Sequence, residues 1–277
     1  MPQRELVVVA ILSSLMMASL VVWLNVARRL SEGETLVPYE PRLRAPWNVV
    51  DVLWLVLAWP IFELVALRVA APGDTIGDGG ISIAGLAGVT AGHFLWTVAA
   101  IFYLEIRTGA RAREFGFDTS SLVQDARLGG LAFLAAAPLV YGVQIVVSRF
   151  WTPLEHPLAK LVSEQNGPAL VALAALSAIV VAPLSEELLF RVVLQGWLER
   201  VLRRRRRTWK AAHRVLPILI SSALFAVMHQ GADRVALFVL ALFLGFLYRQ
   251  THRIFPSLVL HACINALAVL ALALGVS

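Results

Sequence analysis

Three short stretches bring ionisable and amide side chains into an otherwise apolar chain. They are APLSEELLFR at residues 182–191, FAVMHQ at residues 225–230 and HACIN at residues 261–265. A carboxylate, imidazoles and a carboxamide together make a set of side chains that can activate water and stabilise an oxyanion. The three stretches therefore predict a site that hydrolyses an amide, on the condition that the fold brings them together.

The first stretch gives its two glutamates different surroundings. Residues four apart share a helix face, so Glu187 can pair with Arg191. Glu186 is turned by about 100° from Glu187 because an α-helix has 3.6 residues per turn, which leaves its carboxylate to face another helix. A second interpretation stays open: Pro183 breaks the helix and Ser185 caps a new one, where the helix dipole would favour both glutamates in the first turn.

The second and third stretches each place two residues one helical turn apart. Phe225 and His229 share one face, and His261 and Asn265 share another. A carboxylate such as Glu186 can act as a general base, and a histidine can share that role or bind a metal. Asn265 can donate a hydrogen bond to an oxyanion. Taken singly, each histidine or polar pair is also explained by hydrogen bonds between neighbouring membrane helices.

The composition of the chain indicates a membrane protein. Its 277 residues are 59% hydrophobic and 15% charged, whereas a soluble domain carries about a quarter charged residues. The net charge of +6 comes from basic residues that lie between apolar segments, so we expect no nucleic-acid partner. The single cysteine, Cys263, cannot form an internal disulfide and is interpreted as a small packing residue.

Eight apolar segments are candidates to cross a bilayer, which takes about 20 residues of helix. We predict an all-α polytopic membrane protein with a bundle of about eight transmembrane helices. The sixth and seventh segments are short and are predicted to form a helical hairpin, and residues 113–130 to form a short interfacial helix. The segments lie at 5–26, 49–70, 81–104, 127–148, 168–202, 214–230, 233–250 and 254–276.

Basic residues are concentrated in the loops that follow the odd-numbered segments, including the run Arg203 to Arg207. By the positive-inside rule these loops are cytoplasmic, which predicts that both termini lie outside. Arginine outnumbers lysine by 22 to 2, a bias typical of a GC-rich bacterial genome, so we expect the bacterial cytoplasmic (inner) membrane. His93, in the third segment, has no partner motif and is interpreted as a structural residue that bridges helices.

The motifs Glu-Glu-x-x-x-Arg, Phe-x-x-x-His and His-x-x-x-Asn, intact and in this order, resemble those of the CPBP family of intramembrane proteases. This CAAX amino-terminal protease family includes the type II CAAX prenyl endopeptidases and the bacterial Abi-like, bacteriocin-immunity-type proteins. The resemblance covers roughly residues 125–276. We therefore divide the chain into N-terminal transmembrane helices with an interfacial segment at 1–124 and a CPBP-like catalytic helical core at 125–277.

The resemblance implies an intramembrane endopeptidase with a bundle of eight transmembrane helices. Glu186 and His229 would activate a water molecule, and His261 and Asn265 would stabilise the oxyanion. The supporting residues would be Glu187, Arg191 and Phe225. The substrate would be a membrane-associated peptide or protein, prenylated or otherwise lipidated, cleaved near the cytoplasmic face of the lipid bilayer.

The resemblance leaves the cofactor open. The family's naming implies a metalloprotease, and zinc or another divalent metal would be held by Glu186, His229 and His261, since two histidines and a glutamate suit zinc. A metal-free, glutamate-activated water has also been argued for close relatives, and the same three side chains suit a general-base mechanism.

Two other classes of function remain open at this point. A non-catalytic membrane scaffold or bacteriocin-immunity protein could use the same fold. A proton-coupled transporter could use Glu186 and the histidines as a relay, although the chain has no convincing internal repeat of the kind that many transporters show.

The depths of the motif residues test whether they can share one site. His261 lies about 10 Å along its helix from Ile254, and Glu186 lies roughly 25 Å from Leu202, the cytoplasmic end of its segment. The two depths agree only if the tail of the fifth segment leaves the hydrocarbon early, near Trp197. We predict that it does, which would place the site in the cytoplasmic half of the membrane.

Overall fold

The computed structural model describes residues 3–41, 45–74, 81–151, 161, 167–203, 212–229, 231 and 233–274, with helices and connecting loops but no strand among them. Outside the fifth segment the α-helices are α1 (Gln3–Ser31), α2 (Val49–Ala70), α3 (Ile83–Thr108), α4 (Leu122–Ser148), α9 (Ala212–Met228), α10 (Asp233–Thr251) and α11 (Phe255–Ala273). The 3₁₀ turn η1 (Thr119–Ser121) precedes α4.

The fifth segment is one unbroken helical run, Pro168–Arg203, that changes its winding along its length. It begins as α6 (Pro168–Ala175), widens into the π-helical stretch η2 (Leu176–Val181), and returns to α-helix as α7 (Ala182–Glu186). A second π-helical stretch, η3 (Glu187–Gln195), and a final α-helix, α8 (Gly196–Arg203), complete it.

Within the described part of the chain, seven helical segments are long and apolar enough to cross a membrane, and α9 adds a shorter apolar helix. These eight segments correspond to the eight predicted from the sequence. The chain is an all-α polytopic membrane protein, as predicted.

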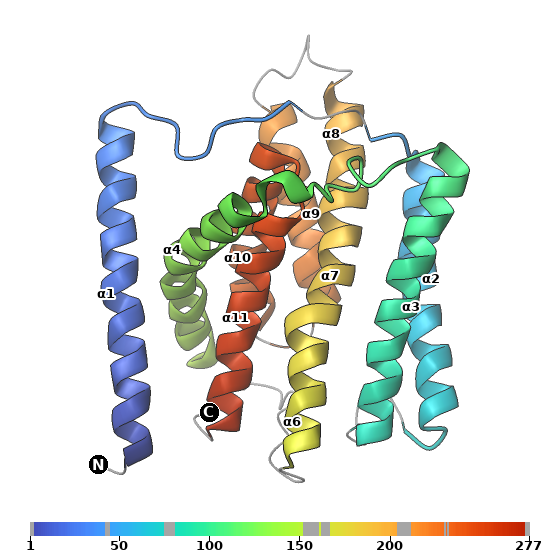
Figure 1. Ribbon diagram of the computed structural model, residues 1–277, viewed down its shortest axis with the longest axis horizontal. Helices are drawn as coiled ribbons and strands as arrows, with labels where there is room; N and C mark the ends of the chain where they lie inside the picture. Colours follow the sequence, from blue (N-terminus) through green and yellow to red (C-terminus); the bar gives the residue numbers. More distant parts are fainter. Residues whose placement is uncertain are drawn as a thin grey trace.

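The fifth segment lies in the middle of the bundle. Figure 1 shows it between the α2–α3 pair on one side and α11 with α4 on the other, with α9 and α10 behind. The helix α1 lies at the edge of the bundle and packs mainly on α4. The three motif helices, α7 with η3, α9 and α11, are therefore neighbours.

The interpretation in which Pro183 breaks the helix and Ser185 caps a new one is wrong. The helix continues through both residues, and the Ser185 hydroxyl donates to the carbonyl oxygen of Ala182, 2.8 Å away, instead of capping an N-terminus. Proline is tolerated inside a membrane helix where local π adjustments and neighbouring groups satisfy the backbone. Here, η2 immediately precedes the turn that carries Pro183.

The separate interfacial helix predicted at 113–130 is not present. Its first residues form turns, and the 3₁₀ turn η1 leads directly into α4, which takes up the rest of the stretch. The side chain of Asp118 accepts hydrogen bonds from the amide and the hydroxyl of Ser120, so this local cap starts the helix. Helix α4 then continues to Ser148 without an interruption.

The loop after α1 is bound to the fifth segment. One nitrogen of the Arg200 guanidinium, Nη1, donates to the carbonyl oxygens of Ala45, Pro46 and Trp47 at 2.7 to 3.0 Å. The indole of Trp47 is fully buried and donates to the carbonyl of Val193 in η3. These contacts fix the upper part of the fifth segment against the loop.

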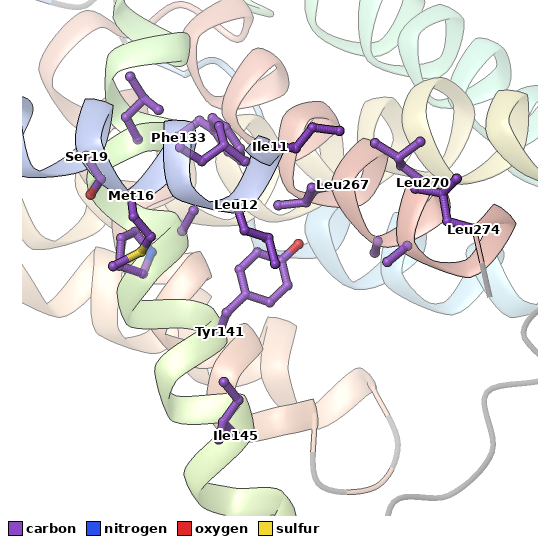
Figure 2. A pocket seen from close by; sticks show the side chains of 16 residues that line it. Ile11, Leu12, Met16, Ser19, Phe133, Tyr141, Ile145, Leu267, Leu270 and Leu274 are labelled. Carbon is purple, nitrogen blue, oxygen red and sulfur yellow. The ribbon is translucent and has the colours of Figure 1, made fainter. Parts of the chain in front are cut away.

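An apolar cavity of about 330 Å³ lies between α1, α4 and α11. Figure 2 shows its wall, which includes Leu12 and Met16 of α1, Tyr141 of α4 and Leu267 of α11. None of the motif residues lines it. This cavity lies where α1 packs on α4 beside α11, away from the three motifs.

Candidate active site

The glutamate that the sequence left unpaired, Glu186, faces both motif histidines. It ends the short α-helical turn α7, between the π-helical stretches η2 and η3, and π-helical insertions are frequent at functional sites. Its Oε1 lies 4.0 Å from Nε2 of His229, and its Oε2 lies 3.5 Å from Nε2 of His261. The condition for a shared site is therefore met.

Each histidine is held through its other ring nitrogen. Nδ1 of His229 lies 2.8 Å from the carbonyl oxygen of Phe225, and Nδ1 of His261 lies 3.0 Å from Oε1 of Glu187. A carbonyl and a carboxylate are acceptors, so the hydrogen-bond network assigns a proton to both Nδ1 atoms. Both Nε2 atoms are thereby directed towards Glu186.

The predicted pair of Glu187 and Arg191 is confirmed. Their side chains are fully buried, and Nε of Arg191 lies 3.5 Å from Oε2 of Glu187. Nη1 of Arg191 donates to the hydroxyl of Ser221 on α9, which in turn donates to the carbonyl of Phe190. Glu187 thus contacts an imidazole on α11, while its partner Arg191 joins η3 to α9.

The charges of the site nearly balance. Glu186 and Glu187 carry two negative charges and Arg191 one positive charge, which leaves one negative charge when both histidines are neutral. A buried charge without a partner is costly, and here His261 lies between the two glutamates and contacts both.

Phe225 packs against both imidazoles. Its ring centroid lies 4.6 Å from that of His229 and 5.8 Å from that of His261, the second contact being edge-to-face. The guanidinium of Arg191 lies over the same ring at 5.2 Å. The phenylalanine of the second motif therefore fills the space behind the two histidines and excludes water from it.

Asn265 supplies a hydrogen-bond donor that the backbone of the fifth segment lacks. In η2 the amide of Ala182 donates to the carbonyl of Ser177, five residues earlier. The next carbonyl in this pattern is that of Ala178, whose partner would be the nitrogen of Pro183, which carries no hydrogen. The carboxamide of Asn265 donates to this carbonyl at 2.7 Å. One of its two N–H groups is used in this way.

The site is open on the side of His229. The His229 side chain is 30% exposed and that of Glu186 is 14% exposed, whereas that of His261 is only 3% exposed. The guanidinium of Arg234, the second residue of α10, donates to the backbone carbonyl of His229 at 2.6 Å and fixes the end of α9. A substrate can therefore reach Glu186 past His229.

Sequence reasoning missed the partners of His93. Nε2 of His93 contacts the carboxylate of Glu63 on α2, and Nδ1 lies 3.5 Å from the hydroxyl of Ser185 on α7. The interpretation of His93 as a structural residue that bridges helices is confirmed, since it contacts both α2 and α7. A glutamate in the middle of the second apolar segment was the signal that could have identified this pair.

The motif residues have the donor types of a zinc site but are not grouped as one. Two imidazoles with Nδ1 held and Nε2 directed towards one carboxylate are the pattern in which histidines ligate zinc. Among the residues that the structure describes, however, no three His, Cys, Asp or Glu side chains are grouped closely enough to hold a metal ion. The three donors would have to approach one another to bind one.

The comparison with known families agrees with this geometry. Residues 168–267 match the family described as type II CAAX prenyl endopeptidase Rce1-like. This match supports the resemblance of the region to the CPBP, or CAAX-protease, family. No curated protein and no solved structure matches the chain.

The CAAX-protease region contains all seven residues that the three motifs singled out. It begins with α6 and ends inside α11, so it includes the whole fifth segment and the hairpin of α9 and α10. Glu63 and His93 lie outside it. At the level of the family, the match supports a CAAX-type intramembrane protease.

Proposed function

We propose that this protein is an intramembrane endopeptidase that hydrolyses a peptide bond of a membrane-associated, prenylated or otherwise lipidated peptide or protein. The family match supports a CAAX-type protease. The observation that carries the chemistry is the convergence of Nε2 of His229 and Nε2 of His261 on the Glu186 carboxylate.

Glu186 and His229 activate the water. The two side chains are 4.0 Å apart at their nearest polar atoms, and a water molecule beside both can donate one hydrogen to the carboxylate and the other to Nε2 of His229. The Glu186 carboxylate then takes a proton as the water oxygen bonds to the scissile carbonyl carbon. The same carboxyl group returns this proton to the nitrogen when the C–N bond breaks.

His261 and Asn265 stabilise the oxyanion. With Nδ1–H donated to Glu187, a protonated His261 presents its Nε2–H at the side of Glu186. Asn265 has a second N–H beyond the one that it donates to Ala178. Donors placed where negative charge develops can contribute about 10²–10³-fold to the rate of an acyl transfer.

Glu187, Arg191 and Phe225 support these groups. Glu187 holds the ring of His261 in one orientation, and Arg191 balances the charge of Glu187. The backbone carbonyl of Phe225 accepts Nδ1–H of His229, and the Phe225 ring packs on both imidazoles. Supporting hydrogen bonds of this type fix ring orientation.

A zinc ion or another divalent cation, when bound, would be held by Glu186, His229 and His261 and would polarise the scissile carbonyl and the attacking water. The steps above use only the side chains of the chain.

The site lies in the cytoplasmic half of the membrane in this proposal. Glu186 and His261 are in contact, although they lie roughly 25 Å and 10 Å along their helices from Leu202 and Ile254. The fifth segment therefore extends roughly 15 Å past the start of α11, and α8 stands highest in Figure 1. With the basic loops on the cytoplasmic side and both termini outside, cleavage occurs near the cytoplasmic face of the bacterial inner membrane.

A purified-protein assay tests the proposal. The wild type in lipid nanodiscs should cleave an internally quenched, farnesylated peptide that ends in a CAAX sequence, and Glu186→Gln should not. Glu105→Gln, which changes an exposed glutamate in α3, is the matched control and should cleave like the wild type. A wild type that leaves the peptide intact would remove the prenylated substrate from the proposal, and a fully active Glu186→Gln would overturn the mechanism.

A further inference from the structure

A second polar cluster lies on the opposite side of α7 and is formed by residues from three helices. His93 on α3 contacts the carboxylate of Glu63 on α2 through Nε2, and its Nδ1 lies 3.5 Å from the hydroxyl oxygen of Ser185 on α7. The indole of Trp59 donates to the same carboxylate and packs edge-to-face on the imidazole, with ring centroids 5.4 Å apart. The cluster therefore links the α2–α3 pair to α7.

The hydrogen bonds define the direction of each donor in this cluster. The hydroxyl of Ser185 donates to the carbonyl of Ala182, so its oxygen can only accept from His93. Nδ1 of His93 therefore carries a hydrogen. Its Nε2 contacts the Glu63 carboxylate, so each of these two ionisable side chains has the other as its partner. Such pairing suits a position inside a membrane span, where a single charge is expensive.

The α2–α3 pair is a fixed support for His93. A Cβ atom at Gly92, the residue before His93, would lie 2.9 Å from the Cα of Glu63, and one at Gly88 would lie 2.8 Å from the carbonyl oxygen of Ala66. Only glycine allows the two backbones to approach so closely. The indole of Trp96 also donates to the carbonyl of Leu55 on α2. The two helices thus hold Glu63 and His93 in one relative position.

The turn that carries Glu186 needs anchors from outside its own helix. Helix α7 has only five residues and lies between two π-helical stretches, which interrupt the regular α-helical hydrogen bonding on both of its sides. Asn265 anchors it on the η2 side, and His261 anchors it at Glu187 on the η3 side. Within the turn itself, His93 contacts Ser185, the residue directly before Glu186.

We propose that His93, which Glu63 contacts from α2, is a positioning residue of the active site. It acts through Ser185 to fix the direction in which the neighbouring Glu186 carboxylate points, because a rotation of α7 that moves Ser185 moves Glu186 by the same angle. This inference rests on the proposed hydrolytic function, and it extends the site to two helices outside the region that matches the CAAX-protease family.

Two substitutions of His93 separate this role from simple helix pairing. The amide nitrogen of an asparagine occupies about the place of Nδ1 and keeps the contact to Ser185, whereas that of a glutamine reaches about the place of Nε2 and keeps the contact to Glu63. With the farnesylated CAAX peptide, we expect His93→Asn to retain kcat within about threefold. His93→Gln should lower kcat by about 10- to 100-fold with KM unchanged, as loss of a supporting hydrogen bond does in other sites.

Ser185→Ala and Thr90→Val complete the set. Ser185→Ala should reproduce the fall in kcat of His93→Gln, and the double variant should fall no further, because both substitutions break the same contact. Thr90→Val is the matched control, since it removes a buried hydroxyl one turn earlier on α3 that bonds only to Leu86 of its own helix. Thermal unfolding in detergent checks that each variant is folded.

The outcomes separate this inference from the proposed function. If Glu186→Gln is inactive while His93→Gln keeps the wild-type kcat, or falls no more than His93→Asn, the positioning role is overturned and the hydrolytic function stands. Additive losses in the double variant also overturn it. If the wild type cleaves neither this peptide nor any protein of its host membrane, both are overturned together.

Discussion

Two ionisable clusters flank the same turn of the fifth segment, and they differ in how their histidines are used. On one side, His229 and His261 each have Nδ1 engaged and present Nε2 to Glu186. On the other side, His93 has both nitrogens engaged, by Glu63 and by Ser185. His229 is 30% exposed, and the buried His261 shares with it the same Glu186 carboxylate, so both can take part in proton transfer at that group. The nitrogens of His93 contact Glu63 and Ser185 instead, so His93 links α2 and α3 to α7 without contacting Glu186.

The two clusters also differ in exposure. His229 is the most exposed imidazole of the three, and Glu186 beside it is partly exposed. In the second cluster Glu63 is 24% exposed and His93 is 13% exposed beside Trp59, while Ser185, the link to α7, is fully buried. Glu186 is therefore open on the side of His229, and the contact between His93 and α7 is closed to solvent.

The largest fall in kcat is expected from Glu186→Gln, which changes the cluster that contains both motif histidines. General acid–base catalysis contributes about 10²–10⁴-fold to a rate, so kcat should fall by about 1000-fold, well beyond the fall expected for His93→Gln. Initial rates on the farnesylated CAAX peptide check this. Equal losses in the two variants would contradict the division between a catalytic and a supporting cluster.

Glu187→Gln should lower the free energy of unfolding more than Glu186→Gln does. The substitution leaves the fully buried Arg191 without its carboxylate partner, and breaking one side of a buried pair costs about 3–5 kcal/mol. Glu186 is partly exposed, so Glu186→Gln should change the free energy of unfolding by less than about 1 kcal/mol. Unfolding in a denaturing detergent measures both. Equal stabilities would show that Glu187 is not the structural member of the pair.

Asn265→Ala should affect both stability and rate. It leaves the carbonyl of Ala178 without a donor at the point where Pro183 supplies none, which costs about 1–3 kcal/mol. Loss of an oxyanion donor should lower kcat by about 10²-fold. A variant with lowered stability and an unchanged kcat would assign Asn265 to the backbone alone and remove it from the proposed oxyanion site.

Gly92→Ala should move the supporting cluster without replacing any of its side chains. The new Cβ would lie 2.9 Å from the Cα of Glu63, and such overpacking costs about 1–3 kcal/mol. By spreading α2 from α3, it should also lower kcat by a few fold. Gly142→Ala in α4 is the control, because nothing lies within 4 Å of the added Cβ, and it should be neutral or slightly stabilising. A larger effect at Gly142 would contradict the role of close α2–α3 packing.

Metal removal should have the smallest effect. Since the proposed steps use only side chains of the chain, dialysis against a chelator should leave kcat within about twofold. Cleavage rates before and after dialysis, and after addition of zinc, check this. A loss that zinc restores would show that Glu186, His229 and His261 close around a metal during the reaction.

The sequence predicted the part of the site that depends on spacing along a helix. The pair of Glu187 and Arg191 follows from a separation of four residues, and so does the position of Phe225 beside His229. The separation of Glu186 from this pair follows from the helical period. Because membrane helices are long and apolar, the eight segments were also visible, with ends that differ by a few residues from those in the structure.

The sequence did not predict features that depend on contacts between segments. Glu63 and His93 are 30 residues apart on different helices, and no local pattern joins them. Similarly, Asn265 could be matched to the carbonyl left free by Pro183 only after η2 was seen to be a π-helix. The capping interpretation of Ser185 failed for the same reason, since a proline normally marks the start of a helix unless a wider turn accommodates it.

The most direct test of hydrolysis by Glu186 is a comparison of protein termini, by mass spectrometry, in host membranes that contain the wild type or Glu186→Gln at equal abundance. We expect new termini that are present only with the wild type, and these would also identify the substrate. Identical sets of termini from two equally folded proteins would contradict the account and leave a non-catalytic membrane scaffold as the function of this fold.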